Sequence, residues 1–169
     1  MGKQLALLFI ICFLFLFTTC KINYSLSGAS IPPEAKTVAV KYFENKASLA
    51  PPTLSQKFSE ALRDKIISQT RLTLVKTNGD VSFEGSITDY VATPIAIQST
   101  DQAALNRLTI TVTVKYTCAF DEKKNYEQSF SRFADYPSTR ILSEVESDLI
   151  TQINDQLVQD IFNKTFNDW

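Results

Sequence analysis

The most regular pattern in the chain is an alternation of apolar and polar residues from Leu108 to Phe120. Its even-numbered positions are apolar or aromatic, and its odd-numbered positions are mostly threonine, with Lys115 among them. Successive side chains of a strand point to opposite faces, so this segment predicts a strand with one buried face. The other face is expected to meet water or a partner.

Shorter stretches rich in β-branched and aromatic residues predict four further strands. They lie at 37–43, at 72–76, from Val81 towards Tyr90, and at 126–136. The sequence Asn78-Gly79-Asp80 predicts a tight turn between the second and third of these, and 121–125 predicts a charged hairpin tip. Pro94 cannot donate a ladder hydrogen bond, so 91–104 is expected to be bent or irregular.

Two segments have apolar residues at helical spacing and predict helices, one from Thr53 to about Thr70 and one from Ser143 nearly to the C-terminus. Each begins with the residue types of a capping box, Thr53 with Gln56 and Ser143 with Glu146. The expected buried stripes are Leu54, Phe58, Ala61, Leu62 and Ile66 in the first helix, and Leu142, Val145, Leu149, Ile153, Leu157 and Ile161 in the second.

This order of elements predicts the fold class. A strand, a helix, several strands and a final helix are typical of an α+β two-layer sandwich, with a mixed, mostly antiparallel sheet of about four to five strands. The first crossover should be right-handed and place both helices on one side or edge of the sheet. The core is then the even-numbered face of 108–120 packed against the two helical stripes.

The N-terminus predicts export. After Lys3, residues 5–17 form an apolar run of 13 residues, whereas a helix that spans a bilayer needs about 20. The pattern is that of a signal peptide, residues 1–19. Phe17-Thr-Thr-Cys20 resembles the bacterial lipobox, which makes Cys20 the expected lipid (palmitate) attachment site. An ordinary signal peptide with a chance cysteine is the alternative. Residues 20–33 are expected to be a lipid-anchored tether, and 34–169 a single domain.

Composition narrows the function. With Lys3 removed from the 17 basic residues, the mature chain has 16 basic and 18 acidic residues, a net charge of −2, and no long basic run. A nucleic-acid surface is therefore not expected. The chain has no histidine, which removes the commonest catalytic bases and zinc ligands, so we expect no catalytic residue, no metal and no cofactor. Cys118 is in phase with the core and is expected to be a buried thiol.

Five stretches resemble a known family: 28–33, 53–56, 83–90, 101–110 and 130–136. The five stretches follow a lipobox in this order, and together they resemble the lipopolysaccharide-assembly lipoprotein family LptE in its Bacteroidetes form. The resemblance implies a small outer-membrane lipoprotein that faces the periplasm and plugs a large β-barrel, LptD. Together the two insert lipopolysaccharide into the outer leaflet. It also implies a sheet with two helices packed on it.

Two sets of residues are candidates for contacts. Thr109, Thr111 and Thr113 are expected to face the partner, because a barrel lumen is polar. Arg107, Lys115 and Arg132 are candidates for binding lipopolysaccharide, which carries phosphates or carboxylates. An ordinary solvent-facing strand and local ion pairs are the alternatives.

Two other features bear on location and on competing functions. Lys21 follows the anchor cysteine where Asp would signal inner-membrane retention in enterobacteria, so an outer-membrane location with the domain in the periplasm is expected. The competing function is a lipid-anchored periplasmic binding module of another envelope complex or of a small ligand.

Overall fold

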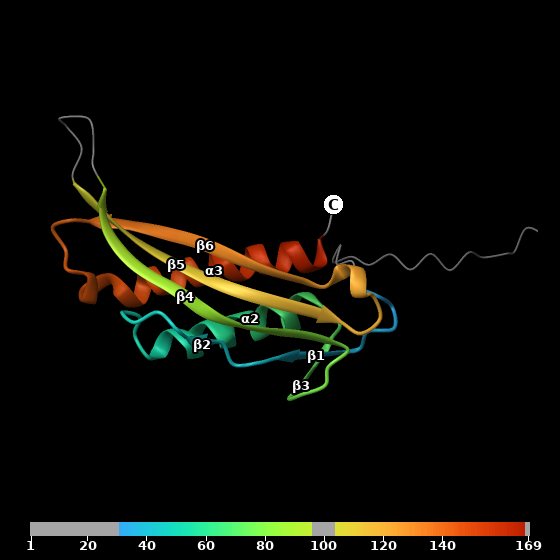
Figure 1. The fold of residues 1–169 in the computed structure, drawn as a ribbon. Coiled ribbons are helices and arrows are strands. Elements are labelled where there is room, and N and C mark those ends of the chain that lie inside the picture. Colours follow the sequence, from blue (N-terminus) through green and yellow to red (C-terminus); the bar gives the residue numbers. More distant parts are fainter. Residues whose placement is uncertain (1–30, 96–103, 168–169) are drawn as a thin grey trace, which may run out of the picture.

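The computed structural model describes residues 31–95 and 104–167 (Figure 1). Two helices cover one face of an open, mixed, six-stranded sheet, which confirms the predicted α+β sandwich. The sheet has more strands than expected, because β2 consists of only two residues and is too short to be predicted from a sequence pattern. The elements are β1 (Thr37–Val40), β2 (Glu44–Asn45), α2 (Thr53–Gln69), β3 (Thr73–Val75), β4 (Val81–Ile95), β5 (Leu105–Cys118), the 3-10 helix η2 (Glu122–Lys124), β6 (Tyr126–Pro137) and α3 (Leu142–Phe166). The expected signal peptide and Cys20 lie outside the described residues.

The sheet combines a parallel part and an antiparallel part. Its order is β3-β1-β4-β5-β6, with β2 beside β4. The long strands β4, β5 and β6 pair antiparallel, whereas β1 pairs parallel with both β3 and β4. The turn at Asn78 therefore does not form a hairpin, because β1 lies between the two strands that it connects. Asn78 has a φ of 55°, a left-handed conformation that asparagine tolerates better than most residues.

A bulge in β4 changes which side chains are buried. The register with β5 shifts between Ile87 and Asp89. Odd-numbered residues such as Phe83 are therefore buried before the bulge, whereas the even-numbered Tyr90 is buried after it. The strand continues to Ile95, so the expectation of bent or irregular structure was wrong for residues 91–95. Residues 96–103 lie outside the described residues. Pro94 is accommodated because, within the described residues, β4 pairs only with β5 beyond Ile87.

Both helices form where the sequence predicts them, but neither capping box does. The residue before α2 is Pro52 and the residue before α3 is Ile141, and neither helix has a side-chain cap hydrogen bond. Backbone carbonyls accept the first amide hydrogens instead, Pro51 O from Leu54 and Ile141 O from Glu144. Glu146 has another partner, because its carboxylate accepts the hydroxyl of Tyr90 at 2.5 Å.

The core lies between the sheet and the helices, as predicted. The even-numbered residues of β5 from Leu108 to Cys118 are buried, and so is most of each helical stripe. Cys118 is a free, buried cysteine, in agreement with its phase. Phe120 departs from the prediction, with 51% of its surface exposed. The reason is that β5 ends at Cys118, so the alternation of faces no longer applies two residues later.

Asp80 joins the turn before β4 to the start of β1. Its Oδ2 accepts the backbone N–H groups of Lys36 and Thr37, both at 2.9 Å, and the Thr37 hydroxyl at 2.8 Å. These hydrogen bonds, that from the Lys36 amide first, lower the pKa of Asp80 below its usual value of 3.8. The carboxylate therefore stabilises the fold above its unfolded-state pKa, and this contribution is lost as the pH falls through its lower folded-state pKa.

We accordingly expect Asp80→Asn to unfold at a lower denaturant concentration than the wild type at pH 7. The difference should narrow as the pH falls below about 4, since the wild-type carboxylate then becomes protonated. Urea unfolding at a series of pH values measures it. A difference that stays constant down to pH 2 would show that the charge of Asp80 is irrelevant.

Candidate functional site: the open face of the sheet

Among residues 31–95 and 104–167, no helix covers the opposite face of the sheet (Figure 1). Thr109, Thr111 and Thr113 lie on this open face, as the alternation predicts. Their rows are set by the strand register: Thr113 lies between Ser86 and Ser129, and Thr111 between Asp89 and Ser131. The hydroxyls of Thr113 and Ser129 are 2.8 Å apart, and Thr111 donates to Ser131 at 3.1 Å. The centre of the open face is therefore a band of hydroxyl groups.

The next row is more apolar. Thr109 lies between Val91 and Phe133, each of which is 46% exposed. Val91 could not be assigned to this face from the sequence, because its side-chain direction depends on the bulge. The open face therefore changes from hydroxyl groups to exposed hydrocarbon along β5.

Arg107 lies on the same face, one row further. Its Nε and Nη2 donate to the two carboxylate oxygens of Asp135 at 2.7 and 2.9 Å, and its guanidinium stacks 3.5 Å from the centre of the Phe133 ring. The Arg107 hydrogen bonds lower the pKa of Asp135. This bidentate geometry occupies the side of the guanidinium that would otherwise bind a ligand carboxylate or phosphate.

Arg132 is on the other side of the sheet. It lies opposite Ile110, whose side chain is in the core, and it donates to both carboxylate oxygens of Asp160 on α3 at 2.5 and 2.8 Å. The structure therefore does not bring the three predicted basic residues together. Arg107 and Lys115 share a face but are eight residues apart, about 27 Å along an extended strand.

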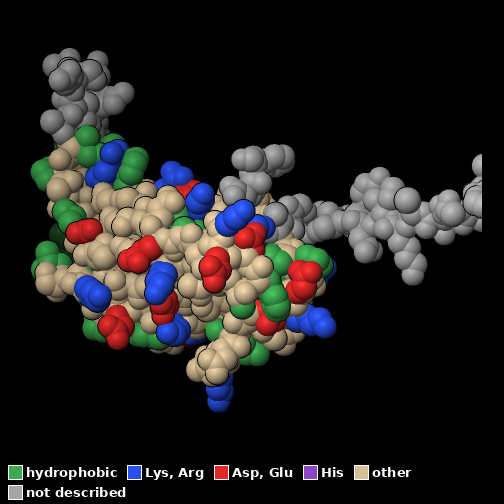
Figure 2. Space-filling model, turned by 45° about the vertical axis from the view of Figure 1, so that its right-hand side comes forward, with side chains coloured by type: hydrophobic (Ala, Val, Ile, Leu, Met, Phe, Trp, Pro, Cys, Tyr) green, Lys and Arg blue, Asp and Glu red, His purple; other side chains and the backbone are tan. Residues whose placement is uncertain are grey.

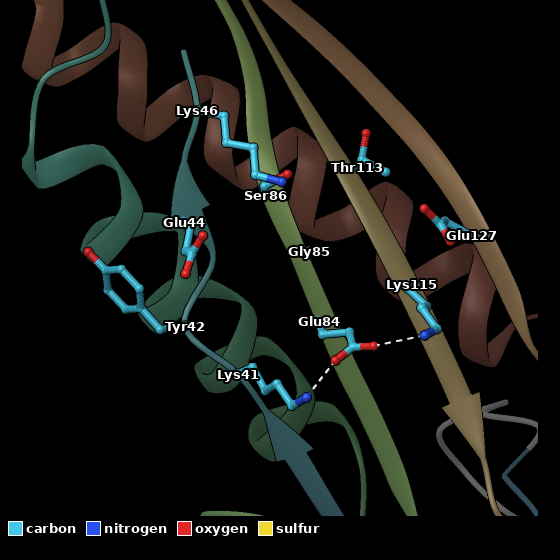
Figure 3. Close-up of a pocket in the computed structure, with 10 residues that line it drawn as sticks. All are labelled: Lys41, Tyr42, Glu44, Lys46, Glu84, Gly85, Ser86, Thr113, Lys115 and Glu127. Carbon is cyan, nitrogen blue, oxygen red and sulfur yellow. Dashed lines mark hydrogen bonds and ion pairs between the residues drawn. The ribbon is translucent and has the colours of Figure 1, made fainter. Parts of the chain in front are cut away.

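Lys115 belongs to a charged cluster that no sequence pattern predicted. Its Nζ lies 3.0 Å from Oε1 of Glu84, and Nζ of Lys41 lies 2.6 Å from Oε2 of the same carboxylate (Figure 3). Hydrogen bonds from Lys41 and then from Lys115 lower the pKa of Glu84. The pairing of Glu84 with Lys115 across β4 and β5, and the position of β1 beside β4, place these charges together, so no local motif could have indicated them.

These three residues border a hollow of about 340 Å³, open to solvent, which we call the Glu84 hollow (Figure 3). Residues of the β1–β2 segment, β4, β5 and β6 form its walls. Ser86, which is 8% exposed, also lines it. The remaining lining residues are Tyr42, Glu44, Lys46, Gly85, Thr113 and Glu127.

Charges of both signs are interspersed on the side of the molecule shown in Figure 2. Within 31–95 and 104–167, no three His, Cys, Asp or Glu side chains are grouped so that they could hold a metal ion. The same ranges contain no helix that is both long enough and apolar enough to cross a membrane.

Comparisons with known proteins identify the family. The family model LptE, described as lipopolysaccharide-assembly, matches residues 35–165, which is most of the chain. A minor lipoprotein from Acinetobacter baumannii has the same fold with 15% identity and a TM-score of 0.50, over 77% of this chain and 91% of that one. A hypothetical protein from Chlamydia trachomatis is 11% identical with a TM-score of 0.53, over 78% of this chain and 98% of that one. No curated protein sequence matches significantly. The family match, rather than these distant structural likenesses, establishes that the chain belongs to the LptE lipopolysaccharide-assembly family.

Proposed function

We propose that this protein is an outer-membrane lipoprotein that plugs and helps to assemble a large LptD-like β-barrel, which inserts lipopolysaccharide into the outer leaflet. Its role is to bind and to position, without catalysis. The family match supports assignment to this pathway. The observation that carries the partner proposal is the uncovered, hydroxyl-rich face of β4, β5 and β6.

The open face suits the inside of a barrel. The interior of an outer-membrane barrel is polar, and hydroxyl groups can exchange hydrogen bonds with water or with a polar wall at little cost. A compact domain of 150 residues has a radius of gyration of about 15 Å. It therefore requires a lumen at least similar to that of barrels with about 16–18 strands.

Affinity purification from detergent-solubilised outer membranes tests the proposal. We expect one large β-barrel protein to co-purify in equal amount and to remain bound through size-exclusion chromatography. If the protein is purified without a barrel, the proposal is wrong, and a lipid-anchored module that binds a small ligand or another envelope complex becomes the better interpretation.

A substitution on the open face should separate assembly from folding. We expect Thr111→Glu to reduce barrel recovery several-fold, because it places a charge against the proposed lumen wall. The change should alter the free energy of unfolding by no more than about 0.5 kcal/mol, since this side chain is outside the core. The measurements are barrel recovery and thermal melting of the purified protein.

Gln152→Glu is the matched control, because it adds the same charge at an exposed position of α3, on the helical side. It should leave both recovery and melting unchanged. Equal barrel recovery for Thr111→Glu and Gln152→Glu would show that the open face does not contact the barrel.

The anchor gives a further prediction. We expect Cys20→Ala to leave an unlipidated precursor that keeps residues 1–19, because the cysteine thiol is the acceptor and lipidation precedes cleavage at a lipobox. The expected readouts are intact-protein mass spectrometry and fractionation, in which the variant is absent from the outer membrane. A wild-type mature N-terminus at an unmodified residue other than Cys20 would contradict the assignment.

A further inference from the structure

We propose that the Glu84 hollow binds a phosphoryl group with an ammonium group beside it, the chemistry of phosphoethanolamine. Lys41, Lys46, Lys115 and the Ser86 hydroxyl hold the phosphoryl group, and Glu44 and Glu127 receive the ammonium. The inference goes beyond the proposed barrel partnership and does not depend on it.

Two hydrogen-bond donors in the hollow have no partner among the described residues. The Lys46 ammonium lies on the rim, and the Ser86 side chain lines the hollow while the residue as a whole is 8% exposed. The Ser86 hydroxyl reaches the surface of the hollow rather than being fully enclosed, so it can donate to a ligand there. An oxygen-rich ligand in the hollow would provide both donors with a partner.

Glu84 holds two more donors in place. Each lysine ammonium has three N–H donors, and Lys41 and Lys115 each use one on the Glu84 carboxylate. The contacts fix the positions of two flexible side chains before any ligand arrives, which reduces the entropy lost on binding. Their remaining donors are available to phosphoryl oxygens, for which charge-assisted hydrogen bonds are strong.

The charge balance of the hollow selects the ligand class. Three lysines face three glutamates, and Glu44 and Glu127 have no ion-pair partner among the described residues. A phosphate alone would be attracted by the lysines and repelled by these two carboxylates. A ligand that also carries an ammonium satisfies both signs, so a zwitterion is favoured over either of its halves.

The test uses the full-length protein in a neutral detergent and isothermal titration with O-phosphoethanolamine, inorganic phosphate and ethanolamine. We expect O-phosphoethanolamine to bind at least about tenfold more tightly than phosphate or ethanolamine. Lys46→Gln and Lys115→Gln should each weaken that binding about tenfold. Lys76→Gln, which removes an exposed lysine outside the hollow, is the matched control and should change nothing.

A double variant tests the selectivity. Glu44→Gln with Glu127→Gln should abolish the preference: phosphate should bind this variant more tightly than it binds the wild type, and the advantage of O-phosphoethanolamine over phosphate should disappear. Melting temperatures should stay near that of the wild type, because all these positions are on the open side of the sheet.

Dihexanoyl phosphatidylethanolamine distinguishes the ligand's source. Tighter binding of this short-chain lipid than of O-phosphoethanolamine indicates a lipid headgroup, and equal binding indicates a soluble phosphoethanolamine. Phosphate bound as tightly as O-phosphoethanolamine, or binding unaffected by Lys46→Gln and Lys115→Gln, would overturn the proposal. Loss of barrel co-purification would not, since the two measurements are independent.

Discussion

Val112→Asp is expected to unfold the domain. Val112 lies at the centre of β5 between Ile87 and Phe130, and its side chain is completely buried beneath the helices. An aspartate there has neither water nor a cation to stabilise its charge, and burying an unpaired charge is among the most destabilising of changes. We expect a loss of at least about 4 kcal/mol, against a total stability of about 5–15 kcal/mol for ordinary domains.

Thr113→Glu is the control, one residue further along the same strand. It also introduces a carboxylate, but on the open face, so the expected change is at most about 0.5 kcal/mol. Urea unfolding followed by circular dichroism measures both variants. If both unfold the domain, the open face must be covered, and the one-sided burial of β5 is wrong.

Gly85→Ala is expected to lower the free energy of unfolding by about 3 kcal/mol or more, although it adds only one methyl group. A Cβ at Gly85 would lie 2.0 Å from the carbonyl oxygen of Thr113 and 2.7 Å from the Phe43 ring. The carbonyl belongs to the neighbouring strand, and Phe43 is buried edge-on against Phe58 with ring centres 5.0 Å apart. Neither neighbour can move without separating β4 from β5 or disturbing the core.

Ser86→Ala provides the comparison, because it changes the adjacent residue and removes a hydroxyl that has no partner in the described structure. Its stability should be within about 0.5 kcal/mol of the wild type. Thermal melting measures both variants. A melting temperature for Gly85→Ala equal to that of Ser86→Ala would show that the two strands are not in close contact at this position.

Elements that repeat a local pattern could be predicted from the sequence alone. The even-numbered face of β5 and the stripes of α2 and α3 could be predicted because side chains recur at fixed angles within one strand or one helix. The same reasoning separated Thr109, Thr111 and Thr113 from the core. It did not work at helix starts, where backbone carbonyls rather than Thr53 or Ser143 accept the first amide hydrogens.

Contacts between residues far apart in the sequence depend on the tertiary structure. The bulge after Ile87 sets the face on which Val91 lies, and the order β3-β1-β4 brings Lys41 to Glu84, which is 43 residues away. Arg132 pairs with Asp160 on α3, and so lies apart from the other two basic residues. Strand register is fixed by the burial of whole faces rather than by any one pair, and a shift of a single residue changes every partner. The Glu84 hollow, made from four such segments, therefore exists only in the folded sheet.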